Sequence, residues 1–159
     1  MKAYMKTHRG LVREQNEDTI CVAEPLYVLA DGMGGHQAGE VASALAARTL
    51  CETLRDMQPS ADALTRGYLA ANSAVFARQK EDETLSGMGT TMTALWEDQE
   101  YVFVGQIGDS RAYLYRDGKL HQITEDQSMV GEMLRAGATT EEQARSHPYR
   151  DVITYAVGT

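Results

Sequence analysis

The chain has 159 residues, of which 43% are hydrophobic and 24% are charged, a balance typical of one water-soluble globular domain. Its net charge of −8 argues against nucleic acid or an anionic membrane as the main partner. The N-terminus lacks an apolar signal region and no apolar run reaches transmembrane length, so we expect a cytoplasmic protein without a membrane anchor.

The first thirty residues are predicted to form strands joined by a polar loop. Residues 2–8 are a candidate edge strand, residues 19–23 a second strand, and residues 26–30 an apolar run typical of a buried strand. Glu17 and Asp18 lie at the end of the polar loop that precedes the second strand. We expect a hairpin to bring these acids beside the strand that leads into Asp31.

Asp31 opens a glycine-rich stretch that ends at Glu40. Three glycines lie within the four residues that follow Asp31, and residues 41–57 then show the apolar spacing of a helix. A carboxylate at a strand end, beside flexible backbone, suits a hard cation such as Mg²⁺ or Mn²⁺. From these residues alone, a tight turn in which Asp31 makes a local hydrogen bond is an equal alternative.

The rest of the chain is predicted to alternate between helices and antiparallel strands. Ser60 is a candidate N-cap for a second helix that ends near residue 80, and Asp117-Gly118 is a strong hairpin signal. The other expected elements are strands at residues 90–96, 101–104, 112–116, 119–123 and 152–157, a helix at 129–136 that stops at Gly137, and a helix capped by Thr139 or Thr140. This order predicts an α+β layered fold.

The two cysteines show no pattern that indicates a metal site. Cys21 lies in the second predicted strand and Cys51 in the first predicted helix, and neither has a Cys-x-x-Cys neighbour or a zinc spacing. We therefore expect two reduced core thiols.

Several short motifs occur in a fixed order along the chain. They are Arg9-Gly10 with Arg13 and Asn16-Glu17-Asp18, then Asp31-Gly32-Met33-Gly34-Gly35-His36, Gly89-Thr90-Thr91, Gly108-Asp109-Ser110-Arg111 and Ile153-Thr154. Together they resemble the bacterial form of the metal-dependent PP2C-type serine/threonine protein phosphatases. The resemblance implies a four-layer α/β/β/α sandwich, in which helices flank two antiparallel sheets. Residues 1–159 would form a single phosphatase domain that stops about two thirds of the way through the family's domain, as expected for part of a longer phosphatase.

The resemblance also implies a metal site built from oxygen ligands. Asp31 would bridge two metal ions, Mn²⁺ or Mg²⁺, and the Gly32 carbonyl would add a ligand. Glu17 and Asp18 would hold metal-bound water or contact a metal directly, and Asp109 matches the acid that can hold a third ion. Arg13 would bind the substrate phosphate, because its planar guanidinium can donate two parallel hydrogen bonds.

The function implied is hydrolysis of phosphoserine and phosphothreonine in proteins by a metal-bridging hydroxide. The expected partners are phosphoproteins produced by a cytosolic Ser/Thr kinase, and the expected state is a monomer. Met33 departs from the family, because some members carry a His there as a candidate general acid, and Gln127 departs as well. Met33 and the chain length leave open an inactive phosphatase-like binding or regulatory module. A small-molecule phosphatase is a third reading, since metals recognise only the phosphate.

Overall fold

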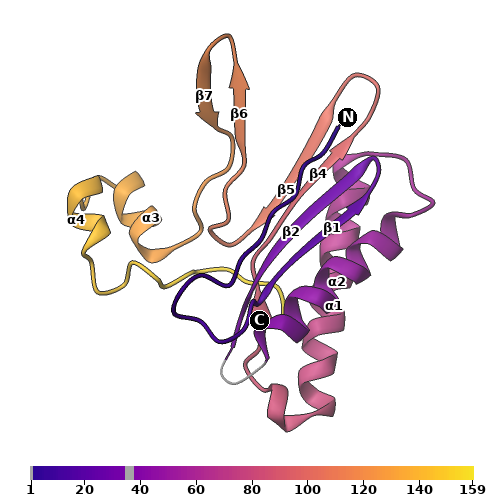
Figure 1. Ribbon diagram of the computed structural model, residues 1–159, viewed down its shortest axis with the longest axis horizontal. Coiled ribbons are helices and arrows are strands. Elements are labelled where there is room, and N and C mark those ends of the chain that lie inside the picture. Colours follow the sequence, from indigo (N-terminus) through magenta and orange to yellow (C-terminus); the bar gives the residue numbers. More distant parts are fainter. Residues whose placement is uncertain (1, 35–37) are drawn as a thin grey trace.

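The computed structural model describes residues 2–34 and 38–159, and its centre is an antiparallel sheet (Figure 1). Within that part of the chain the sheet has five strands in the order β1-β2-β4-β5, with β3 pairing with β2. The strands are β1 (Asp18–Ala23), β2 (Leu26–Met33), β3 (Gly89–Thr90), β4 (Met92–Glu97) and β5 (Val102–Ile107).

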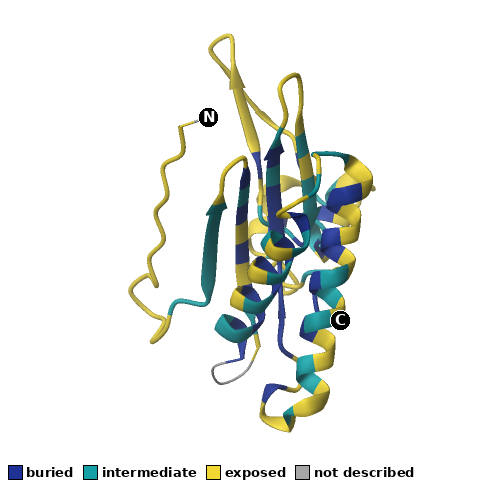
Figure 2. Cartoon of the chain, turned by 90° about the vertical axis from the view of Figure 1, so that its right-hand side faces the viewer, coloured by how far each residue is buried: buried dark blue, intermediate teal, exposed yellow. Residues whose placement is uncertain are grey.

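Two long helices cover one face of this sheet (Figure 1). They are α1 (Gly39–Leu54) and α2 (Ala61–Glu81), and the Ser60 hydroxyl caps α2 by accepting a hydrogen bond from the Ala63 N–H, as predicted. Small side chains such as Ala42 and Ala46 let α1 approach the sheet closely. The core lies between these layers, so the buried colour in Figure 2 is concentrated where strands meet helices.

The alternation of side chains along β2 determines which residues remain outside this core. Leu26, Val28 and Ala30 are buried, whereas Leu29 and Asp31 are exposed. Because successive side chains of a strand point to opposite faces of the sheet, Asp31 lies on the face that the helices leave open.

The segment of residues 113–145 extends away from the sheet, before the chain returns to it at Val157, which bridges to Thr90 (Figure 1). It contains the hairpin of β6 (Tyr113–Arg116) and β7 (Lys119–Gln122), followed by α3 (Met129–Arg135) and α4 (Glu141–Arg145); the 3₁₀ helix η1 (Glu83–Leu85) precedes β3. Asp117 and Gly118 form the predicted hairpin turn with φ angles of 52° and 74°. The predicted helix stop at Gly137 (φ 67°) and the predicted cap at Thr140 are both confirmed.

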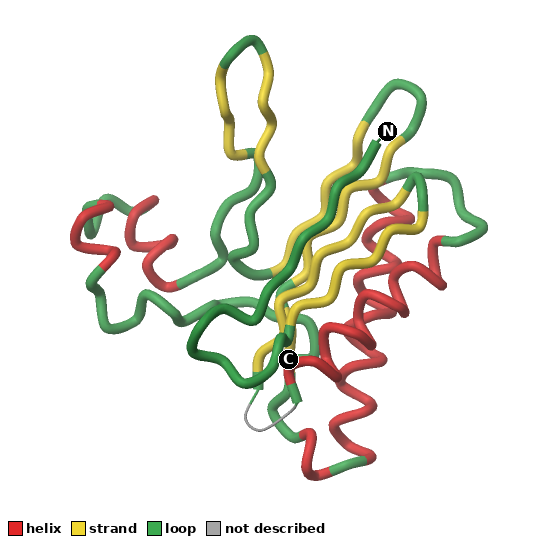
Figure 3. Tube along the Cα trace, in the orientation of Figure 1, coloured by secondary structure: helices red, strands yellow, loops and turns green. Residues whose placement is uncertain are grey.

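Two predicted strands are wrong. Residues 2–8 are exposed, and they form no ladder with any described strand (Figure 3). Residues 152–157 form only isolated bridges, Thr90 with Val157 and Ser128 with Ile153. In addition, β2 does not end at residue 30 but runs on through Asp31 to Met33, because Gly32 and Met33 pair with β3.

The α+β class is confirmed. Of the four expected layers, the described residues contain one helix pair, the sheet that it covers and the two-stranded β6–β7 hairpin. Cys21 of β1 and Cys51 of α1 are free and half-buried, with their sulfur atoms 2.9 Å apart. Burial and the neighbouring Cys21 thiol raise the pKa of Cys51 to about 12, so this thiol is protonated at neutral pH. No helix in the described part of the chain is long and apolar enough to cross a membrane.

Candidate metal centre

The β1–β2 hairpin brings the N-terminal acids to Asp31, as predicted. Asp18 lies directly opposite Asp31 in the antiparallel register. The Gly32 N–H donates to the Glu17 carbonyl over 3.1 Å, which continues the pairing by one residue. Directly opposite residues of an antiparallel pair have Cβ atoms about 5 Å apart on one face. Asp18 and Asp31 therefore share the open face of the sheet.

Two glycines allow the start of α1 to approach this hairpin. A Cβ atom on Gly32 would lie 2.0 Å from the Gly39 carbonyl oxygen and 2.7 Å from the Glu17 carbonyl oxygen. A Cβ atom on Gly39 would lie 2.9 Å from the carboxyl carbon of Glu17. The Glu17 carboxylate thus lies against the first turn of α1, where the helix dipole favours negative charge. The Ser43 hydroxyl fixes this segment by donating to the Glu17 carbonyl over 2.7 Å.

The electrostatics of Asp31 identify its neighbours. Burial of the carboxyl group is the largest cause that raises its pKa, followed by the negative charges of Asp18, Asp109 and Glu17, while Arg13 lowers it. Asp31 as a residue nevertheless remains exposed, so an ion could reach it. Asp109 is far from the others in sequence, and its negative charge also raises the pKa of Asp31. All five predicted charged residues therefore interact electrostatically around position 31.

The N-terminal segment contacts the same group of acids. The Thr7 hydroxyl donates to the Asp18 carboxylate over 2.7 Å, and the Asn16 side-chain amide donates to the Thr7 hydroxyl over 2.9 Å. The Asp18 N–H donates in turn to the Asn16 side-chain oxygen over 3.2 Å. Thr7 was not predicted as a site residue, and nothing in the sequence around it indicates this contact.

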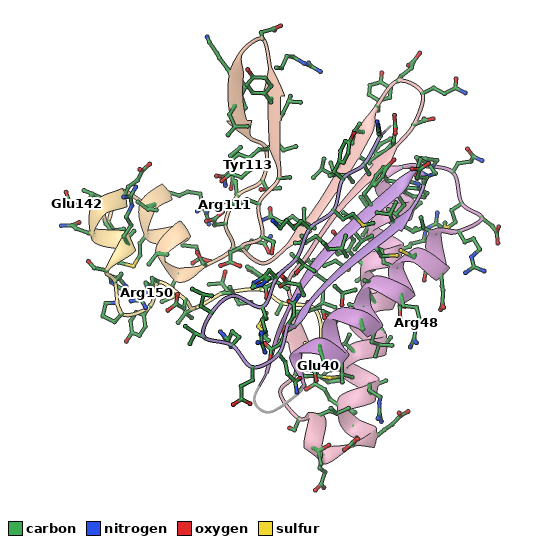
Figure 4. The ribbon with its side chains drawn as sticks, in the orientation of Figure 1. Glu40, Arg48, Arg111, Tyr113, Glu142 and Arg150 are labelled. Carbon is green, nitrogen blue, oxygen red and sulfur yellow. The ribbon has the colours of Figure 1, made fainter. Side chains whose placement is uncertain are left out.

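Asp109 also lines a cleft of about 630 Å³ beside the hairpin and the short helices. Arg111 lies at the base of the β6–β7 hairpin and Arg150 beyond α4 (Figure 4). The Arg111 guanidinium donates to both carboxylate oxygens of Asp126, which also lines the cleft. Residues 129–150 supply much of the lining. Asp31 does not line this cleft, which meets the candidate metal centre only at Asp109.

The carboxylate and carbonyl oxygens are of the type that binds divalent metal ions, but they do not form a complete coordination site. Carboxylate and carbonyl oxygens are the ligands that Mg²⁺ and Mn²⁺ prefer, and mutual repulsion among the acids would be relieved by a cation. Across residues 2–34 and 38–159, however, no three His, Cys, Asp or Glu side chains form a group that could hold a metal ion. Glu40, at the start of α1 (Figure 4), has a buried carboxylate oxygen with no hydrogen-bond partner among these residues. His36 lies outside the described residues.

The sequence matches the family "Protein phosphatase 2C" over residues 9–154. Among curated proteins, the "Serine/threonine protein phosphatase PstP" of Mycobacterium tuberculosis is 44% identical over 155 residues, which are 96% of this chain and 30% of PstP. The "Serine/threonine phosphatase stp" of Listeria monocytogenes is 37% identical over 99% of this chain and 67% of its own length.

Solved structures agree with this match. The crystal structure of M. tuberculosis PstP superposes with a TM-score of 0.88 at 44% identity, covering 96% of this chain and 66% of that one. A structure of the PstP catalytic domain in complex with two manganese ions has a TM-score of 0.86 at 40% identity, covering 96% of this chain and 65% of that one. The chain thus spans about 30% of full-length PstP and about two thirds of the solved PstP chains.

Proposed function

Because the chain belongs to the protein phosphatase 2C family, we propose that the protein containing it hydrolyses phosphoserine and phosphothreonine with the help of Mn²⁺ or Mg²⁺. The observation that carries this proposal is the pairing of Asp18 with Asp31 on the open face of the sheet. Around that pair, Glu17 and Asp109 add negative charge and Arg13 adds a cation. The phosphatase names of the relatives agree with this chemistry.

Each site residue has a role in the proposal. Asp31 would bridge two metal ions, and the Gly32 carbonyl, Glu17 and Asp18 would complete the ligands or hold metal-bound water. When bound, the ions supply charge neutralisation and a water of lowered pKa for attack on phosphorus. Arg13 would bind two phosphate oxygens and orient the ester. Asp109 would hold a third ion.

Met33 bears on the leaving group, and the cleft beside Asp109 bears on the substrate. The thioether of Met33 carries no proton, so we infer that water protonates the departing alcohol. We propose phosphoproteins made by Ser/Thr kinases as substrates, a monomeric protein and a cytoplasmic location. The cleft beside Asp109, with four arginines and five acids in its lining, supports the binding of a polar peptide chain around the phosphorylated residue.

The test is hydrolysis of a phosphothreonine peptide by the purified protein, with Mn²⁺ and with a chelator. We expect activity with Mn²⁺ only, and a loss of at least about 100-fold in Asp31→Asn, since losing a ligand should cost at least as much as losing a group that supports one. Asp56→Asn is the matched control, because Asp56 is exposed and follows the C-terminal end of α1, whereas Glu17 lies against the first turn of that helix. Unchanged activity in Asp31→Asn would exclude the metal mechanism. Phosphopeptide binding without hydrolysis would favour the inactive module.

A further inference from the structure

Thr91 interrupts the strand that faces Asp31. It lies between β3 and β4, at the position opposite Asp31 in the register that both strands share with β2. The Thr91 N–H donates to the Asp31 carbonyl over 2.9 Å, as an antiparallel ladder requires. The Asp31 N–H, however, donates over 3.1 Å to the Thr91 hydroxyl. A side-chain oxygen thus takes the place of a ladder carbonyl at the candidate metal ligand.

The same hydroxyl reaches the loop that carries Asp109. Thr91 Oγ1 and Ser110 Oγ are 2.8 Å apart and share a hydrogen bond. On the other side of Asp109, a Cβ atom on Gly108 would lie 2.7 Å from the Thr91 Cβ atom, and Gly108 has a φ of 97° that favours glycine. Thr91 therefore contacts both chain neighbours of Asp109.

Gln127 also holds this loop. The side-chain oxygen of Gln127 accepts from the Gly108 N–H over 2.8 Å, and the backbone N–H of Gln127 donates to the Gly108 carbonyl over 3.1 Å. With Thr91 and Ser110, these bonds leave little freedom for the backbone on either side of Asp109. Among these contacts, Thr91 alone also holds Asp31 directly.

We propose that Thr91 is a positioning residue that fixes the backbone of Asp31 relative to that of Asp109, and so sets the distance between two metal-binding carboxylates. The metal-binding part of this inference depends on the proposed function. Thr91 is 3% exposed and its hydroxyl has partners on both sides, so its role is internal. Groups that orient metal ligands commonly change metal affinity by about 10- to 100-fold when they are removed.

The experiment compares Thr91→Val with Thr91→Ser. Valine keeps the branched shape and removes the hydroxyl, whereas serine keeps the hydroxyl. Mn²⁺ affinity is measured by calorimetry and by the paramagnetic resonance of free Mn²⁺, on protein whose folding is checked by circular dichroism. We expect the dissociation constant to rise about 10- to 100-fold in Thr91→Val and to stay within about threefold of the wild type in Thr91→Ser.

Thr93→Val is the matched control. Thr93 is also buried, and its hydroxyl donates to the Ser110 carbonyl over 3.0 Å, but it makes no hydrogen bond to Asp31. An equal loss of Mn²⁺ affinity in Thr93→Val would indicate general loosening of the loop and overturn the proposal. Wild-type affinity in Thr91→Val, or weak binding in Thr91→Ser, would overturn it too.

The outcome separates this inference from the proposed phosphatase activity. If Thr91→Val weakens Mn²⁺ binding while the wild type hydrolyses no phosphopeptide, the positioning role stands and the proposed function fails. If the wild type is a Mn²⁺-dependent phosphatase and Thr91→Val binds Mn²⁺ normally, only the positioning role fails. A wild type that binds no Mn²⁺ overturns both.

Discussion

At position 31, the chain holds a carboxylate where folding alone would disfavour one. Burial and the charges of Asp18, Asp109 and Glu17 all raise its pKa, and Arg13 offsets only part of that effect. Raising the pKa of an acid in the folded state means that its ionised form is less stable there than in the unfolded chain. The proposed cation site gives a functional reason to retain such an arrangement.

Without metal, Asp31→Asn should therefore stabilise the fold at neutral pH. The contribution of Asp31 to stability is fully present below its ordinary pKa of 3.8 and is lost as the pH rises through the raised value of the folded state. Asparagine carries no charge, so the variant does not lose this stability as the pH rises. Urea unfolding with a chelator at pH 7.5 measures the effect, and Asp56→Asn should leave the free energy of unfolding nearly unchanged. A less stable Asp31→Asn protein would contradict this electrostatic description.

At this scale the sequence predicted the charged residues but missed the neutral ones. Glu17, Asp18 and Asp31 could be placed together because a short hairpin leaves few alternatives for residues at its ends. The role of the Thr91 hydroxyl could not be predicted, because its hydrogen-bond partners come from β2 and from the loop after β5. Hydrogen bonds between distant segments leave no local pattern in the sequence. Thr91 lies in the Gly89-Thr90-Thr91 motif, which was the only available signal.

At the scale of elements, the site depends on how closely β2 and α1 approach each other. Gly32 lies at the crossing, and its missing side chain leaves room for the Gly39 carbonyl. The same contact holds Glu17 against the first turn of α1. Backbone packing thus determines where the carboxylates lie.

Gly32→Ala should cost about 3 kcal/mol of unfolding free energy, because a methyl group there would collide with backbone that cannot rotate away. Gly118→Ala is the control: Gly118 also has a special conformation, with a φ of 74°, but a Cβ atom there has no neighbour within 4 Å. It should cost only about 1 kcal/mol, from backbone strain alone. Urea unfolding of both variants provides the comparison, and equal costs would contradict the proposed close contact.

Helices with a capping residue or an apolar repeat in the sequence were predictable. Two expected strands, which depend on pairing with another segment, were wrong. The helix expected at residues 41–57 is α1 at Gly39–Leu54, and Ser60 caps α2 as its residue type indicates. Residues 2–8 have the composition of a strand but find no ladder among the described strands. A strand needs hydrogen bonds from another segment, and composition does not reveal whether that segment is within reach.

At the scale of the whole molecule, one face of the sheet is covered by α1 and α2 and the other carries the site. Leu29 of β2 and Val104 of β5 are 40% and 37% exposed, so the strands also carry exposed apolar side chains. The sandwich expected from the family resemblance would place a second sheet over this face. The described chain, which spans about two thirds of the solved PstP chains, supplies the helix-covered half and the hairpin.

The central claim is that Asp31 anchors divalent cations, and Mn²⁺ titration of the wild type and of Asp31→Asn by calorimetry tests it most directly. We predict that the wild type binds Mn²⁺ and that its dissociation constant rises by at least about 100-fold in Asp31→Asn, while Asp56→Asn behaves as the wild type. Equal Mn²⁺ affinity in the wild type and Asp31→Asn would contradict the account.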